Sequence, residues 1–213
     1  MYDLTGELPV ELAFFRDLVR LDLQLNHLYG SLPNEWGTIA SNFSSMAYMR
    51  LEGNQFTGAF PEEWCGFNST TMQEIILARN RLTGTLPSCL ADLSALQDFS
   101  VKDNLMSGTI PTELGEIQGL QTLHLAGNEL SGKVPSTVCN LAENDLYEVS
   151  ADCLNILSEN YVQCSCCSKC CDGPEDTCVV RYDIGGEKDE VPEDEVLETS
   201  SVAADDHSAH NHH

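Results

Sequence analysis

The fold is decided by one stretch, Leu18-Val-Arg-Leu21-Asp-Leu23-Gln-Leu-Asn26-His-Leu28-Tyr-Gly30-Ser-Leu32-Pro33. Its last six residues have the form Leu-x-Gly-x-Leu-Pro, with other apolar residues replacing Leu in some copies. This hexapeptide occurs six times, ending at Pro9, Pro33, Pro61, Pro87, Pro111 and Pro135. Successive prolines are 24, 28, 26, 24 and 24 residues apart. A fixed period in the twenties indicates a solenoid, in which each unit buries its apolar face only against its neighbours.

Each unit also contains an apolar alternation, such as Leu21-Asp-Leu23, that predicts a β-strand with one buried face. Stacking pairs these strands into a parallel sheet. An Asn follows each alternation at Asn26, Asn54, Asn80, Asn104 and Asn128. We expect its amide to bond backbone groups that the turn leaves free. Gly permits the tight backbone path and Pro fixes φ, so we interpret these repeat residues as scaffold.

Five full units follow the pattern Leu-x-x-Leu-x-Leu-x-x-Asn-x-Leu-x-Gly-x-Leu-Pro. On this pattern the chain resembles the plant-type leucine-rich repeat family from residue 4 to about residue 152. The resemblance extends to receptor-like kinase ectodomains and to secreted polygalacturonase inhibitors. It implies an α/β solenoid, a right-handed horseshoe with a parallel β-sheet on the concave face. Short helical or irregular segments are then expected on the convex side. Trp36 and Trp64 share a column with Leu and Val, so we predict that they pack in the core.

Composition divides the chain into three predicted segments. Residues 1–152 form the solenoid of about six units, residues 153–178 form a Cys-rich C-terminal cap, and residues 179–213 form an acidic, disordered tail that ends in His. The net charge of −24 argues against nucleic-acid binding through a basic surface. No run approaches the roughly 18 apolar residues of a membrane span.

Ten cysteines, an even number, indicate an oxidising compartment. Cys65 and Cys89 follow the prolines of adjacent units, and we predict that they bridge neighbouring turns. The other disulfide candidates are Cys139, Cys153, Cys164, Cys166, Cys167, Cys170, Cys171 and Cys178, whose connectivity cannot be read from the sequence. The Cys-x-Cys and Cys-Cys spacings within this cluster are also typical of a thiolate metal site, although the position of the cluster after the last repeat favours disulfides. Together with Asp152-Cys153, it resembles the Cys-rich end of algal leucine-rich repeat proteins.

Two glycosylation acceptors, at Asn42 and Asn68, fall in the two longest units. They agree with an extracellular or cell-surface location. No signal peptide precedes the repeats, and no polar cap covers the first unit, so we expect an N-terminally truncated chain. The alternative is a cytosolic repeat protein with reduced thiols.

Side chains between the buried strand positions point outward from a predicted sheet of six strands. The candidates for ligand contact are Tyr48, Arg50, Glu74, Arg79, Lys102 and His124. No nucleophile accompanies His124 in the sequence, and no phosphate-binding loop or kinase motif occurs. We therefore expect no enzyme, no catalytic residue, no cofactor and no resident metal.

These observations predict an extracellular recognition module that binds a protein, peptide or glycan through the concave face. Signalling would then pass through a partner or through a segment outside this sequence. The alternative is a structural or cation-binding matrix protein that acts through its acidic tail, where His207, His210, His212 and His213 gather. The oligomeric state is not indicated by the sequence.

Overall fold

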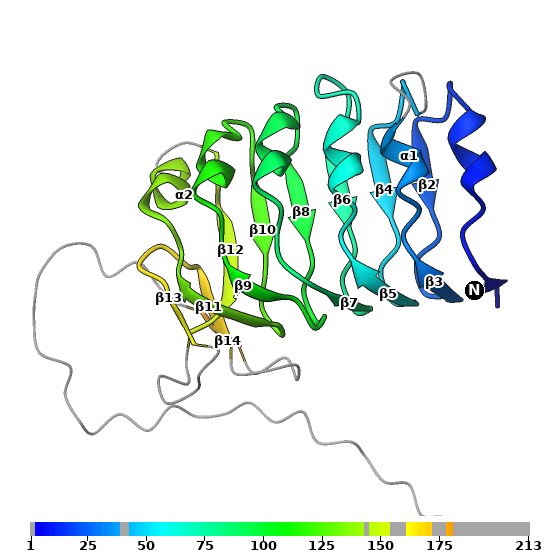
Figure 1. Cartoon of the computed structure of the whole chain (residues 1–213). Coiled ribbons are helices and arrows are strands. Elements are labelled where there is room, and N and C mark those ends of the chain that lie inside the picture. Colours follow the sequence, from blue (N-terminus) through cyan, green and yellow to red (C-terminus); the bar gives the residue numbers. More distant parts are fainter. Residues whose placement is uncertain (1–2, 39–42, 143–144, 154–160, 172–177, 181–213) are drawn as a thin grey trace, which may run out of the picture. The chain divides into compact units, whose positions relative to one another are not determined.

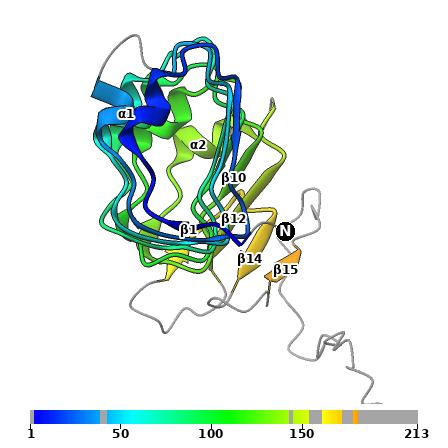
Figure 2. The same cartoon turned by 90° about the vertical axis from the view of Figure 1, so that its right-hand side faces the viewer.

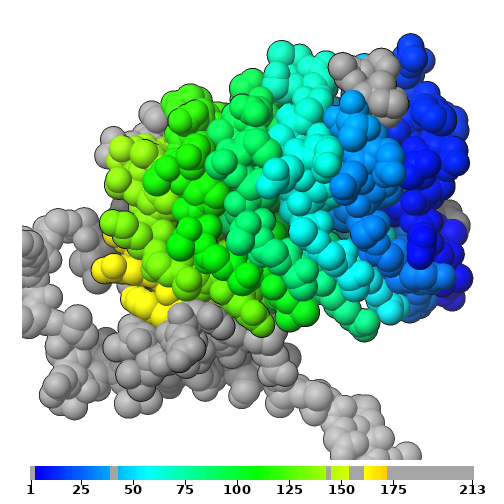
Figure 3. Space-filling model, viewed as in Figure 1, coloured from blue at the N-terminus to red at the C-terminus, as the bar shows by residue number. Residues whose placement is uncertain are grey.

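The repeats stack side by side along one axis, so that segments about 25 residues apart in sequence are neighbours (Figure 1). The computed structural model describes residues 3–38, 43–142, 145–153, 161–171 and 178–180. All of them lie in the compact unit Met1–Tyr182. The second unit, Asp183–His213, lies outside the described residues, and so do the predicted tail histidines. The space-filling view shows the units packed as adjacent bands of colour (Figure 3).

One side of the stack is an eight-stranded sheet, which Figure 2 shows from its N-terminal end. In sheet order its strands are β15 (Cys178–Val180), β14 (Lys169–Cys171), β12 (Glu148–Asp152), β10 (Thr122–His124), β8 (Asp98–Ser100), β6 (Glu74–Ile76), β4 (Tyr48–Arg50) and β2 (Arg20–Asp22). The strands from β2 to β14 are parallel, and β15 pairs antiparallel with β14. The predicted solenoid with its parallel sheet is therefore confirmed.

The sheet is longer than the six strands predicted, because β14 and β15 come from the Cys-rich segment. Cys170 pairs with Ala151 of β12 and is buried, so a half-cystine occupies the position that Leu holds in the repeats. A search for the Leu pattern misses this strand for that reason.

The segment after each repeat Asn forms a second layer of strands, where the sequence indicated only a tight backbone path. Strands β1 (Thr5–Gly6), β3 (His27–Ser31), β5 (Gln55–Ala59) and β7 (Arg81–Thr83) pair in one sheet, and β9 (Ser107–Thr109), β11 (Glu129–Lys133) and β13 (Val162–Gln163) pair in another. The repeat glycines lie in these strands, except Gly84, which directly follows β7. Gly30 has φ +87° and Gly84 has φ +79°, a region that L side chains rarely adopt. The repeat therefore requires Gly at these positions.

Short helices cover the side opposite the eight-stranded sheet (Figure 2). They are η1 (Val10–Phe14), α1 (Glu35–Thr38), η2 (Glu62–Gly66), η3 (Ser88–Asp92), η4 (Thr112–Glu116) and α2 (Ser136–Leu141). Each begins one or two residues after a repeat proline, whose extended backbone leads into the turn. The core lies between these helices and the two layers of strands.

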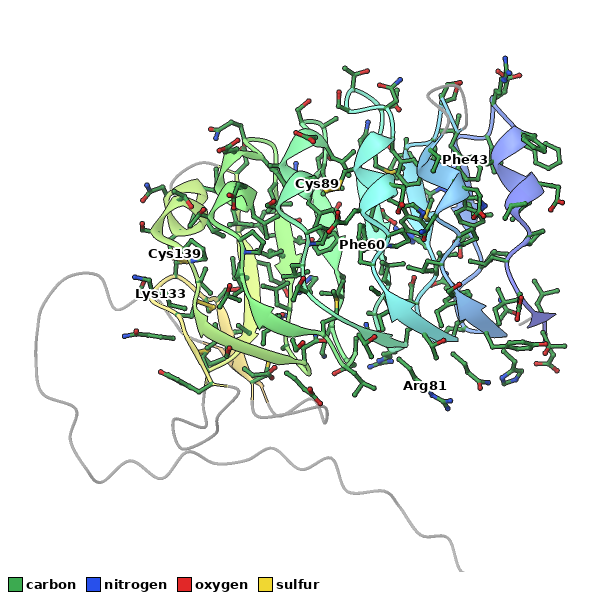
Figure 4. All side chains as sticks on the ribbon, viewed as in Figure 1. Phe43, Phe60, Arg81, Cys89, Lys133 and Cys139 are labelled. Atoms are coloured by element: carbon green, nitrogen blue, oxygen red, sulfur yellow. A yellow bond between two sulfur atoms is a disulfide. The ribbon has the colours of Figure 1, made fainter. Side chains whose placement is uncertain are left out.

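Both tryptophans pack in this core, as predicted. Trp36 and Trp64 are fully buried and stack with ring centroids 5.7 Å apart. The indole nitrogen of Trp64 donates a hydrogen bond to the Pro33 carbonyl at 2.8 Å, which satisfies its polar group. Phe60 packs edge-on against Trp64, and Figure 4 shows its side chain directed into the interior.

The repeat asparagines form a ladder of buried amides that links each unit to the preceding one. The Oδ1 atom of Asn80 accepts a hydrogen bond from Phe56 N at 3.0 Å. Its Nδ2 atom donates to the carbonyls of Leu77 and Leu51, one in its own unit and one in the unit before. Asn54, Asn104 and Asn128 repeat this pattern. The expected satisfaction of free backbone groups is confirmed.

Four disulfides are described. Cys65 and Cys89 join the neighbouring helices η2 and η3, with Cα atoms 5.7 Å apart. The other pairs are Cys139–Cys166, Cys153–Cys170 and Cys164–Cys167, and Cys171 is also disulfide-bonded. These sulfurs are therefore not thiolates, which removes them as ligands of the alternative metal site.

Candidate ligand-binding face

We call the outward side of strands β4 to β14 the sheet face. At its N-terminal end the ring of Tyr48 is held from two sides. The guanidinium carbon of Arg20 lies 4.4 Å from the ring centroid, a cation–π arrangement. The Tyr48 hydroxyl donates a hydrogen bond to Gln73 Oε1 at 2.8 Å. Tyr48 therefore presents a half-buried, preoriented aromatic surface.

Arg50 and Glu74 occupy neighbouring strands and form a two-point ion pair. Arg50 Nη2 lies 3.0 Å from Glu74 Oε2, and Arg50 Nε donates to Oε1. The hydrogen bond to Glu74 raises the pKa of Arg50 above its already high value, so this side chain is a permanent cation. The Glu74 side chain is only 9% exposed, whereas that of Arg50 is 36% exposed. Of these two candidates, Arg50 is the one that offers surface to a ligand.

Arg79 lies beyond the end of β6, in a turn with φ +55°. It is exposed, and its Nε atom is 3.7 Å from Asp103 Oδ2. Lys102 Nζ lies 4.0 Å from the same carboxylate oxygen. Asp103 therefore holds two of the predicted cations near one edge of the sheet face.

Lys102 and His124 line a small hollow in the sheet face, with a volume of about 160 Å³. Its lining residues are Ser100, Lys102, His124, Glu148, Ser150 and Lys169. They come from β8, β10, β12 and β14 and from the residue pair after β8. Four neighbouring units thus contribute to one site, which no single repeat could form.

The hollow contains a connected set of polar groups. Lys169 Nζ donates to Glu148 Oε1 at 2.6 Å. His124 Nδ1 lies 3.3 Å from Ser150 Oγ and 3.7 Å from the same Glu148 oxygen. Burial lowers the pKa of His124, against the opposing influence of Glu148, so its imidazole is neutral at neutral pH. The site therefore combines two ammonium groups, one carboxylate, two hydroxyls and a neutral imidazole.

The sequence selected two of these six residues. Ser100, Glu148 and Ser150 occupy outward strand positions, but the sequence alone does not distinguish them from the other polar side chains in the same columns. Lys169 falls in the predicted Cys-rich cap, outside the predicted strands. Its side chain points outward because β14 joins the sheet, and the sequence contains no repeat pattern that predicts this strand. Its position next to Cys170 is the only local feature that marks it.

Of the predicted glycosylation acceptors, Asn68 is described and exposed, whereas Asn42 lies outside the described residues. Asn68 Oδ1 accepts hydrogen bonds from Thr70 N at 3.0 Å and from Thr70 Oγ1 at 2.8 Å. Within the described part of the chain, no group of three or more His, Cys, Asp or Glu side chains is arranged to hold a metal. None of the described helices is long and apolar enough to cross a membrane.

The chain is similar to known leucine-rich repeat proteins. The family model for the leucine rich repeat matches residues 70–130. No curated protein matches the chain significantly. Among solved structures, the plant peptide hormone receptor RGFR1 in complex with RGF2 is 30% identical over 70% of this chain, with a TM-score of 0.64.

Two structures from Arabidopsis thaliana are also similar. The leucine-rich repeat ectodomain of the receptor kinase GASSHO1/SCHENGEN3, in complex with CASPARIAN STRIP INTEGRITY FACTOR 2, is 29% identical over 76% of this chain, with a TM-score of 0.64. A chain of the BIR3–SERK2 complex is 34% identical over 62% of this chain and 67% of its own length, with a TM-score of 0.54. By contrast, the chain spans only 23% of the RGFR1 chain and 18% of the GASSHO1/SCHENGEN3 chain.

Proposed function

Because the chain belongs to the plant-type leucine-rich repeat family, we propose that it is an extracellular recognition module that binds a peptide or a segment of a protein through its sheet face. The observation that carries the proposal is the hollow at Lys102, His124 and Lys169, where polar groups from four units converge. A ligand backbone needs both donors and acceptors, and the ammonium, carboxylate and hydroxyl groups of the hollow supply both.

The dimensions of the sheet face suit an extended peptide. Six strands from β4 to β14 at a spacing of about 4.8 Å span about 24 Å. At about 3.3 Å per residue, this length accommodates roughly seven residues of extended chain. Arg50 and Tyr48 would contact one end of such a peptide and the hollow the other. The solved relatives that are described as peptide hormone receptors support this class of ligand.

An extracellular location is supported by the disulfides, which persist in oxidising compartments. The ligand contacts proposed here are binding contacts, and we assign them no catalytic role. Binding of a glycan on the same face stays a prediction. The cation-binding tail also stays a prediction, because its histidines lie outside the described residues.

The test is a selection of random linear peptides, displayed on phage, against the folded chain with its disulfides intact. We expect enriched peptides to lose at least tenfold in affinity for Lys102→Glu, because this change reverses a charge in the hollow. The matched control is Arg81→Glu, the same charge reversal at an exposed residue of β7 outside the sheet face (Figure 4).

Circular dichroism would verify that both variants fold. The proposal is wrong if the selection enriches no peptide that binds the folded chain better than the reduced and unfolded chain. It is also wrong if the enriched peptides bind Lys102→Glu and Arg81→Glu equally well.

A further inference from the structure

A second hollow lies outside the sheet face, where the last strands of the second layer meet α2. It has a volume of about 290 Å³, and the described residues that line it are Lys133, Val134, Ser136, Gln163 and Ser165. Lys133 ends β11, Gln163 ends β13, and Ser136 begins α2 (Figure 1). We call this hollow the cap pocket. It shares no described lining residue with the hollow of the sheet face.

Backbone pairing and a disulfide fix the walls of the cap pocket relative to each other. β11 and β13 are parallel, with Lys133 and Gln163 as neighbours across the pair. Val134 N donates a hydrogen bond to Gln163 O at 2.9 Å. The disulfide Cys139–Cys166 bonds α2 to the segment after β13, with Cα atoms 5.3 Å apart. Walls that are fixed before binding lose little conformational freedom when a ligand enters.

The cap pocket has one positive charge that no acidic side chain neutralises. Lys133 forms no ion pair with another residue of the described chain, although the whole chain has a net charge of −24. No Asp or Glu is among the described residues that line the pocket. The hollow of the sheet face differs, because Glu148 there binds Lys169. The cap pocket therefore favours an anionic group.

The other polar side chains of the cap pocket are available to a ligand. Within the described ranges, the side chains of Ser136 and Gln163 form no hydrogen bond. Ser165 Oγ lies 3.6 Å from Cys139 Sγ, and sulfur is only a weak hydrogen-bonding partner. Hydroxyl and carboxamide groups can each donate and accept, so they match ligand hydroxyls, which do the same.

The charge, the polar groups and the volume together define a class of ligand. An ammonium group only donates, and its charge suits a carboxylate or sulfate oxygen. The volume of about 290 Å³ is near the lower limit of ligand pockets, roughly 300 Å³, so the cap pocket suits one small ring. A small ring with several hydroxyls and one acidic group is an acidic sugar residue.

We propose that the cap pocket binds an acidic sugar residue, with Lys133 at its carboxylate or sulfate group and with Gln163, Ser136 and Ser165 at its ring hydroxyls. The free sugar acid and the same residue within a polysaccharide share this chemistry. The proposal does not depend on peptide binding by the sheet face, because the two sites have no described lining residue in common.

The test is a titration of the full, disulfide-bonded and isotope-labelled chain with glucuronic acid, followed by two-dimensional amide NMR at constant ionic strength. We expect saturable shifts of the amide signals of the residues that line the cap pocket. Glucose, which lacks the charge, and inorganic sulfate, which lacks the ring, should each bind about tenfold more weakly. Methyl glucuronide mimics a linked residue: retained affinity assigns the site to a polysaccharide, and lost affinity assigns it to the free sugar acid.

Three variants test the assigned contacts. Lys133→Met should weaken glucuronic acid binding about tenfold, because it removes a charge-assisted hydrogen bond. Gln163→Leu removes a neutral one and should weaken binding roughly fivefold. Arg81→Met is the matched control and should leave binding unchanged. Arg81 is also exposed, lies on β7 of the second layer and forms no ion pair in the described chain, but it lines neither hollow (Figure 4).

Absence of saturable shifts with both glucuronic acid and methyl glucuronide overturns the proposal. Equal affinities of Lys133→Met and Arg81→Met for glucuronic acid also overturn it, because binding would then follow from general charge. Inorganic sulfate that binds as tightly as glucuronic acid would exclude a place for the ring and would overturn the class of ligand. Because Lys133, Gln163 and Arg81 are exposed, we expect all three variants to fold, and the dispersion of their amide signals checks this.

Discussion

The substitution Asn104→Ala tests whether the asparagine ladder holds the stack together. Asn104 is buried with 6% exposure. Its Oδ1 atom accepts a hydrogen bond from Leu82 N at 2.9 Å. Its Nδ2 atom donates to the carbonyls of Val101 at 2.9 Å and Leu77 at 3.0 Å. The change to Ala removes these three bonds at once, together with a longer bond from Nδ2 to the Lys102 carbonyl at 3.3 Å.

The expected loss follows from what each backbone group retains. The carbonyls of Leu77 and Val101 keep second donors, Asn80 and Asn128, so each loses an ordinary hydrogen bond, about 1 kcal/mol. The buried N–H of Leu82 loses the amide oxygen that it donates to, which costs about 2 kcal/mol. We therefore expect Asn104→Ala to lower the free energy of unfolding by about 4 kcal/mol.

Asn26→Ala is the matched control, because it changes the same residue type at the exposed end of the ladder. Asn26 bonds Leu4 N, Leu23 O and Gln24 O, and within the described chain it has no carbonyl of a preceding strand to bond. We expect it to cost about 1 kcal/mol. Urea unfolding followed by circular dichroism, with disulfides intact, measures both values. Equal losses, or a loss below about 1 kcal/mol for Asn104→Ala, would refute this account of the ladder.

Three further predictions concern the sheet face and its surroundings. Burial lowers the pKa of His124 below its ordinary value of 6.5. The stability that the neutral imidazole confers is therefore present above the pKa of the unfolded chain and is lost as pH falls through the pKa of the folded chain. Urea unfolding across this pH range should show the loss in the wild type and not in His124→Gln. Arg50→Met leaves the buried Glu74 carboxylate unpaired and should cost about 2 kcal/mol, most of which the double variant Arg50→Met/Glu74→Leu should recover in the same assay. Chains secreted from eukaryotic cells should carry an N-glycan at Asn68, so Asn68→Gln should remove one glycan from the intact mass; an unchanged mass would contradict this prediction.

Local patterns predicted the strands, the buried tryptophans and the asparagine hydrogen bonds correctly, because every repeat unit must satisfy the same physical requirements. A strand that slips by one residue would expose Leu21 and Leu23, so the apolar alternation sets the register. The same periodicity placed Trp36 and Trp64 in the core. The asparagines followed from the need to satisfy backbone groups at a turn. Each of these inferences depends on residues within one unit or on identical positions in adjacent units.

The sequence by itself determined the stack, its period, the parallel sheet and the outward columns of side chains. Only the tertiary structure decided that Glu74 lies buried beneath Arg50, because that depends on side-chain geometry across two strands. It also decided that Lys169 completes the hollow, because β14 joins the sheet and Cys153–Cys170 bonds it to the end of β12. The repeat positions of Cys65 and Cys89 predicted their bridge, which the structure contains. The pairing of the cysteines after the last repeat and the contacts between dissimilar segments have no period in the sequence, so only the folded chain shows them.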